Sequence, residues 1–461
     1  MKSYNSVYII GITLVATLGG LLFGYDTAVI SGAEKSIQHY LIEPLGLGAF
    51  AHGATVSSAL LGCIIGGAIS GLLSNHLGRK RTLQLAAFLF FTSALGSAFP
   101  EFLFFKKGEP SPALLYTFNF YRIWGGIGVG LASAVSPTYI GEIAPAAIRG
   151  RLVSFNQFAI IFGMLVVYFV NWGIANGQSI EWINSTGWRY MFASEAIPAG
   201  LFFVLLFFVP ETPRYLALIR QEDKALGVLK KINTSAEQAK NILAEITSTL
   251  TDTSKSQIFS YGKKVIIIGI LLSVFQQFVG INVVLYYAPR IFESMGVARD
   301  ASMLQTIVMG LVNVIFTVVA ILSVDKWGRK PLLITGSVGM AFGMIALSVL
   351  SYFDIFSILT LIFIIIFTAS FMMSWGPICW VYISELFPNK IRGQSVAIAV
   401  AFQWLANFII SSTYPGMMQF SSAFTYGFYA AMAVLSAIFV WKMVPETKGK
   451  TLEQIEKIWK R

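Results

Sequence analysis

A short motif occurs twice in the chain, as SNHLGRK at residues 74–80 and as VDKWGRK at residues 324–330. Two further motifs repeat in the same order. EIAP at 142–145, followed by IRG, has its counterpart in ELFP at 385–388, also followed by IRG. PET at 210–212 recurs at 445–447. Three motifs in one order at similar spacings indicate that a large unit has been duplicated.

Long apolar runs fill the space between these motifs. Runs of about 18 to 25 apolar residues are long enough to cross a bilayer as helices. We identify six of them before a polar interval and six after it. They lie at about 8–30, 52–74, 83–100, 115–139, 153–174 and 190–209, and at about 264–288, 303–324, 331–352, 355–382, 394–415 and 424–444.

The sequence therefore predicts an all-α polytopic membrane protein with twelve transmembrane helices in two six-helix pseudo-repeats. Parallel repeats of this kind are a transporter architecture, with the substrate site between the halves. The expected domains are an N-terminal half at 1–209, a cytoplasmic linker with short helices at 210–263, a C-terminal half at 264–444 and a cytoplasmic tail at 445–461.

The composition excludes other protein classes. The 461 residues are 56% hydrophobic and 12% charged, with a net charge of +11, whereas soluble domains carry about 25% charged residues. The basic residues do not cluster as in nucleic-acid-binding proteins. If the amino terminus is cytoplasmic, 26 of the 33 Lys and Arg residues fall in cytoplasmic segments. The positive-inside rule then places both termini in the cytoplasm. We expect the protein to lie in the inner (plasma) membrane.

Three charged residues lie inside the predicted spans, namely Asp26, Arg122 and Glu195. Charges at bilayer depth are costly and usually functional. Asp26 and Arg122 are expected either to form a static buried ion pair or to take part in proton coupling, with Asp26 as the proton acceptor. Glu195 either tunes Arg122 or anchors the end of its helix.

The seventh span carries three carboxamides, Gln276, Gln277 and Asn282. Carboxamides both donate and accept hydrogen bonds, as sugar hydroxyls require. Gln277 and Asn282 would lie about 140° apart on a straight helix. Both can face one cavity only if the helix breaks between them, and we expect that break at Gly280.

Taken together, these motifs resemble the sugar porter family of the major facilitator superfamily. The resemblance rests on GGLLFGYD at 19–26, QQFVGIN at 276–282, PETPR at 210–214, PETKG at 445–449 and the duplicated GRK and IRG elements, and it covers the whole chain. SFNQFAIIFG at 154–163 and SWGP at 374–377 resemble bacterial D-xylose/proton symporters in particular.

The resemblance implies a set of sugar-site residues. It assigns the sugar hydroxyls to Gln157, Gln276, Gln277, Asn282 and Trp380, the remaining lining to Phe23, Tyr286, Gln403 and Trp404, and a weaker place to Asn313. It also supports Asp26 as the coupling residue, since uniporters of the family tend to have Asn there. Met164 stands where the xylose symporters have a second Gln, which bears on pentose specificity.

Charged residues also gather at the predicted cytoplasmic helix ends. Carboxylates and guanidinium groups in such places can pair with one another and with helix dipoles. We expect these residues to close the cytoplasmic gate. They are Arg79, Glu142, Arg149 and Glu211 in the first half, and Arg329, Glu385 and Arg392 in the second.

The expected function is proton-coupled uptake of a monosaccharide, D-xylose by resemblance, through alternating access. The alternative is a facilitative hexose or pentose uniporter without proton coupling. We expect no enzymatic activity, cofactor, metal site or nucleic-acid partner; the partners are a monosaccharide, a proton and the lipid bilayer, and the functional unit is a monomer. The sequence shows neither the Ser/His/Asp order of a catalytic triad nor a phosphate loop. Both observations argue against an enzyme.

Overall fold

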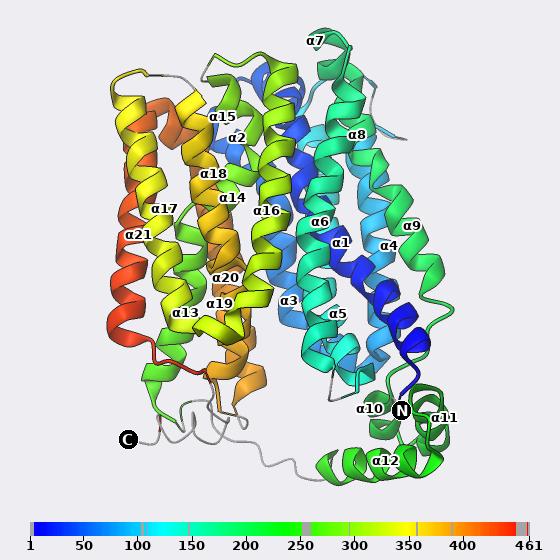
Figure 1. The fold of residues 1–461 in the computed structure, drawn as a ribbon. Coiled ribbons are helices and arrows are strands. Elements are labelled where there is room, and N and C mark those ends of the chain that lie inside the picture. Colours follow the sequence, from blue (N-terminus) through cyan, green and yellow to red (C-terminus); the bar gives the residue numbers. More distant parts are fainter. Residues whose placement is uncertain are drawn as a thin grey trace.

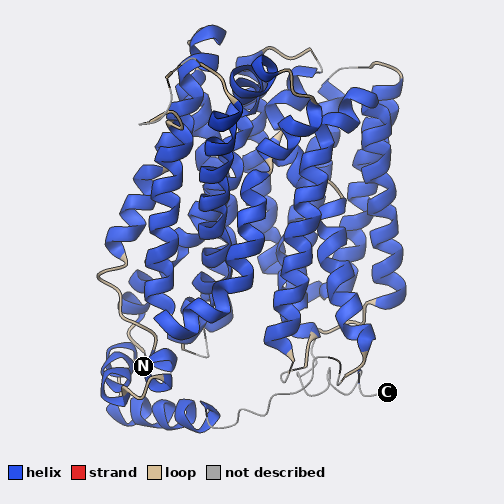
Figure 2. Cartoon of the chain, turned by 180° about the vertical axis from the view of Figure 1, so that it is seen from behind, coloured by secondary structure: helices blue, strands red, loops and turns tan. Residues whose placement is uncertain are grey.

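The structure is a computed structural model of the chain. It describes residues 4–102, 106–107, 109–145, 148–250, 259, 261–294, 296–355, 358–388, 391–448 and 459, without the side chains of Thr249, Leu250, Asp325, Ser384, Arg392 and Gly393. Nearly all of this part is helical (Figure 2). Its extended pairing is one isolated antiparallel bridge between Tyr4 and Asn233.

The elements follow the order that the apolar runs predict. Before the linker they are α1 (Ser6–Ile37), η1 (Gln38–Ile42), η2 (Glu43–Leu45), α2 (Ala49–Val56), α3 (Ser58–Leu77), α4 (Arg79–Ala98), α5 (Pro112–Ile143), α6 (Arg149–Ala175), α7 (Ile180–Trp182), η3 (Ile183–Gly187), α8 (Trp188–Ser194) and α9 (Ala196–Leu205). The linker region holds α10 (Pro213–Leu218), α11 (Glu222–Ile232) and α12 (Ala236–Leu250).

The second half begins directly after the linker. Its helices are α13 (Lys263–Phe278), α14 (Ile281–Tyr286), α15 (Ala288–Ser294), α16 (Arg299–Trp327), α17 (Arg329–Tyr352), α18 (Ile358–Met373), α19 (Trp375–Leu386), α20 (Arg392–Phe420) and α21 (Ser422–Met443).

Ten helices of the described chain are long and apolar enough to cross a membrane. The two remaining predicted spans coincide with α4 and with the consecutive helices α8 and α9. α4 begins with the basic residues 79–81, which lower its hydropathy, and α8 is separated from α9 at Glu195, so that each piece is short. Every one of the twelve predicted spans therefore coincides with helix.

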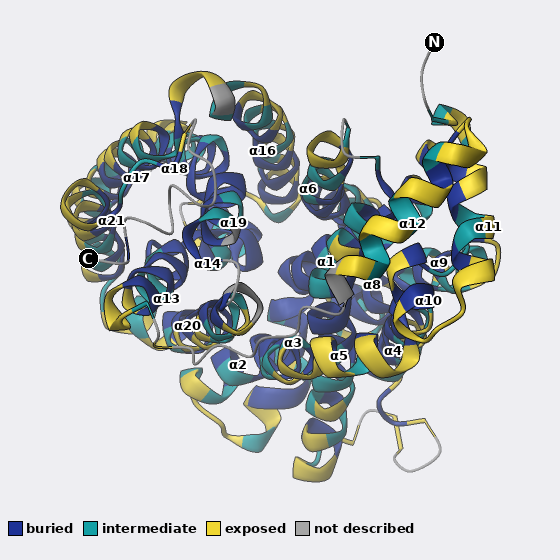
Figure 3. Cartoon of the chain, turned by 90° about the horizontal axis from the view of Figure 1, so that it is seen from below, coloured by how far each residue is buried: buried dark blue, intermediate teal, exposed yellow. Residues whose placement is uncertain are grey.

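The helices form two groups beside each other, one built from α1 to α9 and the other from α13 to α21 (Figures 1 and 3). The linker helices α10–α12 lie at the same end as the start of α1; we call this end the linker side. The opposite end, which carries α2, α7 and α15, is the far side. Many large apolar side chains are exposed, among them Leu14, Phe162, Ile315, Phe342 and Leu435. An apolar surface of this extent suits a lipid environment.

α1 and α6 approach each other very closely, and this contact positions the candidate proton and sugar residues of the first half. A Cβ atom on Gly24 would lie 1.8 Å from the carbonyl oxygen of Ile160, and one on Gly163 would lie 2.2 Å from that of Leu21. Small residues at such points let membrane helices pack backbone to backbone. The segment of α1 that carries Phe23 and Asp26 is thereby fixed against α6.

The seventh span is broken where the sequence predicts. α13 ends at Phe278 and α14 begins at Ile281, and Gly280 between them has a φ of +90°. Side chains other than glycine rarely adopt this left-handed conformation. A Cβ atom there would also lie 2.8 Å from Cγ of Tyr429. The expected break at Gly280 is confirmed, and it lets Gln277 and Asn282 meet.

Candidate functional site

A buried ion pair joins α1 to α5. Nη1 of Arg122 donates to Oδ1 of Asp26 over 2.6 Å, and Nη2 of Arg122 donates to the carbonyl oxygen of Asp26 over 3.2 Å. The two residues are 1% and 0% exposed. The guanidinium also lies 5.2 Å from the ring centre of Phe192 on α8. Oδ2 of Asp26 has no hydrogen-bond partner among the described residues.

Glu195 joins this pair at the break between α8 and α9. It is 1% exposed and lies close to Asp26 and Arg122. Neither carboxylate oxygen of Glu195 accepts a hydrogen bond within the described chain. Two carboxyl groups therefore lie near one guanidinium in a buried site, and one of them, Asp26, is paired with it.

Four of the predicted carboxamides form one hydrogen-bonded network. Nε2 of Gln276 donates to the carbonyl oxygen of Trp375 over 2.9 Å, which ties α13 to α19. Gln277 and Gln403 both donate to Oε1 of Gln276. Nδ2 of Asn282 in turn donates to Oε1 of Gln277 across the break in the seventh span. The network thus brings α13, α14 and α20 to one point.

Aromatic side chains adjoin the carboxamides and connect the two halves. The ring of Phe23 on α1 lies 5.5 Å from the ring of Trp404 on α20, at an interplanar angle of 51°. Tyr286 on α14 accepts a hydrogen bond of 3.3 Å from Nδ2 of Asn407 on α20. Within the described residues, Nε1 of Trp404 and Oε1 of Gln403 are buried without a partner. Buried polar groups are normally satisfied, so these two are free to meet a ligand or water.

The remaining predicted sugar residues stand apart from this network. Gln157 on α6 and Trp380 on α19 are half-buried, and Asn313 on α16 is buried. Within the described chain none of the three forms a hydrogen bond or ring contact with the network residues. Met164 is 7% exposed. It lies two turns beyond Gln157 on the same face of α6, because seven residues nearly complete two helical turns.

The candidate proton residue and a candidate sugar residue are neighbours on α1. Asp26 follows Phe23 by three residues on α1, which places both on one side of the helix.

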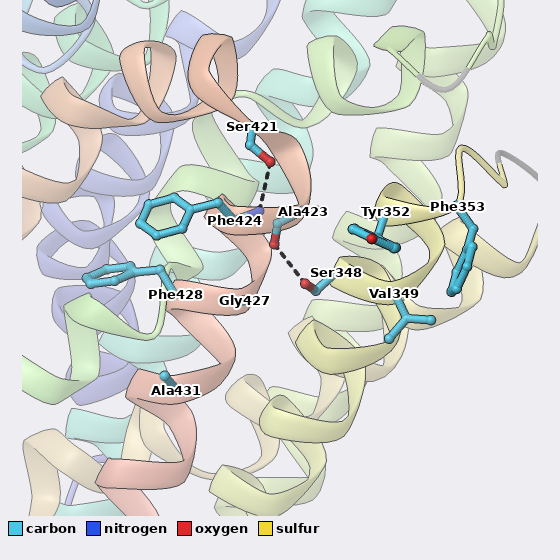
Figure 4. A pocket seen from close by; sticks show the side chains of 10 residues that line it. All are labelled: Ser348, Val349, Tyr352, Phe353, Ser421, Ala423, Phe424, Gly427, Phe428 and Ala431. Carbon is cyan, nitrogen blue, oxygen red and sulfur yellow. Dashed lines mark hydrogen bonds between the residues drawn. The ribbon is translucent and has the colours of Figure 1, made fainter.

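A large cavity elsewhere does not belong to this site. It has a volume of about 700 Å³ and lies between α17 and α21 towards the far side (Figure 4). Its lining includes the rings of Tyr352, Phe353, Phe424 and Phe428, and Oγ of Ser348 donates to the carbonyl oxygen of Ala423. None of the predicted sugar or proton residues lines it.

On the linker side, the charged residues of the first half form a compact cluster. Nη2 of Arg79 donates to Glu142 over 3.0 Å, and Thr212 donates to the other oxygen of Glu142. Glu211 accepts the backbone N–H groups of Arg79 and Lys80 at the start of α4. Burial raises the pKa of Glu211, although the N–H groups that it accepts oppose this change. Carboxylates are favourable at a helix N-terminus.

The second half repeats this arrangement. Nη2 of Arg329 donates to Glu385 over 2.9 Å, and Thr447 donates to Glu385 as well. Glu446 accepts the backbone N–H groups of Arg329 and Lys330, as Glu211 does in the first half. The first cluster joins the first half to the start of the linker, and the second joins the second half to the start of the tail. We did not predict Glu446, although its place in the second PET motif matches that of Glu211.

Two predicted gate residues lie outside these clusters. Arg149 is exposed and forms no ion pair within the described chain. The side chain of Arg392 lies outside the described part. Asn75 accepts a hydrogen bond of 3.5 Å from Arg79, and so takes part in the first cluster as a neutral side chain.

Comparison with known proteins agrees with this architecture. Residues 12–459 match the family described as "Sugar (and other) transporter". The D-xylose-proton symporter of Escherichia coli (strain K12) is 53% identical over 99% of this chain and 96% of its own length. The glucose facilitated diffusion protein of Zymomonas mobilis is 39% identical over 97% of each chain.

A solved structure is similar over nearly the whole chain. It is the major facilitator superfamily proton:xylose symporter XylE bound to 6-bromo-6-deoxy-D-glucose, with a TM-score of 0.85 and 52% identity over 99% of this chain and 100% of that one. The likeness confirms the predicted major facilitator fold. The chain is therefore a membrane transporter that belongs to the sugar (and other) transporter family.

Proposed function

We propose that the chain carries a monosaccharide, D-xylose, into the cell together with a proton. The observation that carries this proposal is the buried cluster of Asp26, Arg122 and Glu195 beside the carboxamide network. Titratable groups at this depth are costly, and a transporter retains them where they move a proton. A facilitator that moves only sugar has no need of a second carboxyl group against the same guanidinium.

The proton acts through the partner of Arg122. When Asp26 is ionised, Arg122 is held to α1 by a hydrogen bond of 2.6 Å. When a proton neutralises Asp26, that attraction is lost and Glu195 on the neighbouring element becomes the ionised partner. α1 is then released from α5. A two-state exchange of this kind biases a conformational equilibrium, because each protonation state favours a different contact.

The sugar is bound by the carboxamides. Gln277, Asn282 and Gln403 supply donors and acceptors that suit hydroxyl groups. Trp404 and Phe23 supply ring faces for the C–H surface of the sugar. Nε1 of Trp404, which has no partner in the described chain, supplies a hydrogen-bond donor. Gln276 uses its amide within the protein, so it orients the network. Gln157, Trp380, Tyr286 and Asn313 complete the lining.

Transport follows from alternating access between the two halves. The linker side is the cytoplasmic side, both termini lie there, and the protein works as a monomer in the inner membrane. The halves are residues 1–209 and 264–444, joined by the linker at 210–263 and followed by the tail from 445. The linker-side clusters, with Arg149 and Arg392, hold the cytoplasmic gate in the state in which that side is closed.

We choose D-xylose and a proton as the substrates because a relative that is 53% identical to this chain is named a D-xylose-proton symporter. A facilitative uniporter is the second candidate, because a relative of 39% identity is named a glucose facilitated diffusion protein. Met164 gives α6 an apolar side chain two turns from Gln157, so other pentoses and hexoses belong in the same assay.

The experiment is uptake of labelled D-xylose into proteoliposomes that contain the purified full-length chain and an imposed inward proton gradient. The proposal predicts accumulation above the external concentration, its collapse on addition of a protonophore, and strongest competition by unlabelled D-xylose in a panel with glucose, galactose and arabinose. Equilibration without accumulation, insensitive to the protonophore, would establish the uniporter instead.

A further inference from the structure

A second charge cluster lies on the far side, away from the sites described above; two of its members are buried and the third, Arg290, has a side chain that is 30% exposed. It consists of Glu34 near the end of α1, His52 in α2 and Arg290 in α15; we call it the far-side cluster. Nη1 of Arg290 donates to Oε2 of Glu34 over 2.9 Å. Nε2 of His52 lies 3.2 Å from the same carboxylate oxygen and 3.1 Å from the carbonyl oxygen of Glu34. Glu34 and His52 are 1% and 2% exposed.

His52 joins the cluster as a bridge. Its Nδ1 lies 3.4 Å from Nη1 of Arg290, and a guanidinium can only donate. Nδ1 is therefore the acceptor, which leaves the proton of a neutral imidazole on Nε2, directed at Glu34. The ring also packs edge-on against Tyr287, with centroids 6.3 Å apart. Histidine thus links the acid and the base instead of competing with either.

The far-side cluster crosses the boundary between the two halves. Glu34 and His52 belong to the first half, and Arg290 belongs to the second. The adjacent residues repeat the connection, because Lys35 on α1 forms an ion pair with Glu293 on α15. Within the described chain, these two ion pairs are the ones that join the halves, and both lie on the far side. Around them the halves are in close contact: a Cβ on Gly53 would lie 2.0 Å from the carbonyl oxygen of Ser412 on α20.

The cluster connects the two helices that carry the transport machinery. α1 holds Asp26 about two turns before Glu34. α15 follows α14, which holds Asn282 and Tyr286. An interaction between Glu34 and Arg290 therefore fixes the proton-carrying helix to the broken helix of the sugar site. Separation of the far side requires this interaction to break.

Buried ions suit a contact that must open as well as close. An apolar contact is more stabilising than a buried ion pair, because the ions lose hydration when they are buried. The same hydration returns when the interface opens, so the open state is not strongly disfavoured. Removal of one partner is different, since it leaves an uncompensated charge in the closed interface.

We propose that Glu34, His52 and Arg290 form the lock of the far-side gate, which is broken and re-formed once in each transport cycle. This inference rests on the proposed alternating-access function. The lock selects the state in which the far side is closed. Its members act as positioning residues, because they hold α14 and α15 against α1 without contacting the sugar.

Amide hydrogen exchange of the full-length chain in nanodiscs tests this inference. Glu34→Gln and Arg290→Gln should each raise exchange of the amides of α2 and α15 by about tenfold or more, because each removes the ion pair between the halves, and Arg290→Gln also leaves the buried carboxylate of Glu34 without its guanidinium partner. Exchange in α10–α12 on the linker side should not change. The double variant should add little to either single variant, since both remove the same interaction. Arg290→Lys keeps the charge and should restore much of the protection.

The control is Glu43→Gln, which removes an exposed carboxylate from the same side. Among the described residues Glu43 pairs with its near neighbours His39 and Gln38, and the side chains of Glu43 and His39 are more than half exposed. Unchanged exchange in both single variants, additive effects in the double variant, or an equal increase for Glu43→Gln would each overturn the proposal. The measurement does not depend on transport. A chain that proves unable to accumulate sugar can still show the lock, and a proven symporter can still lack it.

Discussion

Nη1 of Arg122 lies 2.6 Å from Oδ1 of Asp26, in a cluster where Glu195 is the second carboxyl group. The arrangement has one more acid than base, and none of the three residues is more than 1% exposed. A pair that served only packing would be replaced favourably by apolar side chains. The proposed function assigns the transported proton to this surplus carboxyl group.

Asp26→Asn should abolish accumulation of sugar and leave exchange of sugar intact. Asparagine preserves the shape of the side chain but cannot bind and release a proton. The measurement compares concentrative uptake with counterflow in the same proteoliposomes. Asp300→Asn, in the exposed first turn of α16, serves as the control and should accumulate sugar as the unmodified chain does. Accumulation by the Asp26 variant would exclude this residue from coupling.

Glu195→Gln should lower proton-driven uptake by about tenfold or more, because protonation of Asp26 would then leave Arg122 buried without an ionised partner. Equilibrium binding of sugar should change little, since Glu195 has no contact with the carboxamide network. Initial rates under a proton gradient and calorimetric titration with D-xylose separate these effects. Glu181→Gln, exposed in α7, is the matched control. An equal loss of binding would show that Glu195 merely supports the fold.

Gly280→Ala should weaken sugar binding and lower the Tm. Alanine at a φ of +90° costs about 1–2 kcal/mol in backbone strain, and its Cβ would lie 2.8 Å from Cγ of Tyr429. Gly296→Ala separates the two causes, because Gly296 has a φ of +82° but no atom within 4 Å of an added Cβ. Equal Tm shifts and equal sugar affinities in the two variants would refute a special role for the break.

Gln403→Ala should raise the Kd for the transported sugar by about tenfold, which corresponds to one good hydrogen bond. Gln403 donates to Gln276, and its Oε1 has no partner in the described chain. Gln394→Ala, exposed near the start of the same helix, should leave the Kd unchanged. Calorimetric titration measures both. A normal Kd in the Gln403 variant would remove this residue from the sugar site.

The pair of Glu101 and Arg189 should make stability depend on pH. Burial opposes ionisation of Glu101, but hydrogen bonds from Arg189 and Tyr40 prevail and lower its pKa from the ordinary 4.5. The stabilisation is therefore complete above about pH 4.5 and is lost as the pH falls through the lower folded value. The Tm difference between the unmodified chain and Glu101→Gln should be constant from about pH 7 down to about pH 5 and should shrink as the pH falls below about 4.5. A difference that stays constant throughout would contradict the assignment.

The positions of the spans follow from the sequence because a bilayer demands long apolar helices. The break at Gly280 was also predictable, since Gln277 and Asn282 cannot face one cavity on a straight helix. The interruption at Glu195 was not. It lies inside an apolar run, and hydropathy does not distinguish a continuous helix from two short ones.

Contacts between elements that are distant in sequence were harder to predict. Glu34, His52 and Arg290 lie near the edges of apolar runs, where charges are ordinarily explained by membrane topology. Only the assembled halves bring them together. Asn407, which donates to Tyr286, gave a usable signal, because an amide inside an apolar helix requires a partner. Glu446 was available from the repeat of the PET motif.

The central claim is that sugar and proton move together, and sugar-induced proton movement tests it most directly. Addition of D-xylose to proteoliposomes without an imposed gradient should cause alkalinisation of the external medium, as protons enter with the sugar. The Asp26→Asn variant should show no such change while it still exchanges labelled sugar. Sugar entry into liposomes of the unmodified chain with no change in external pH would contradict the account.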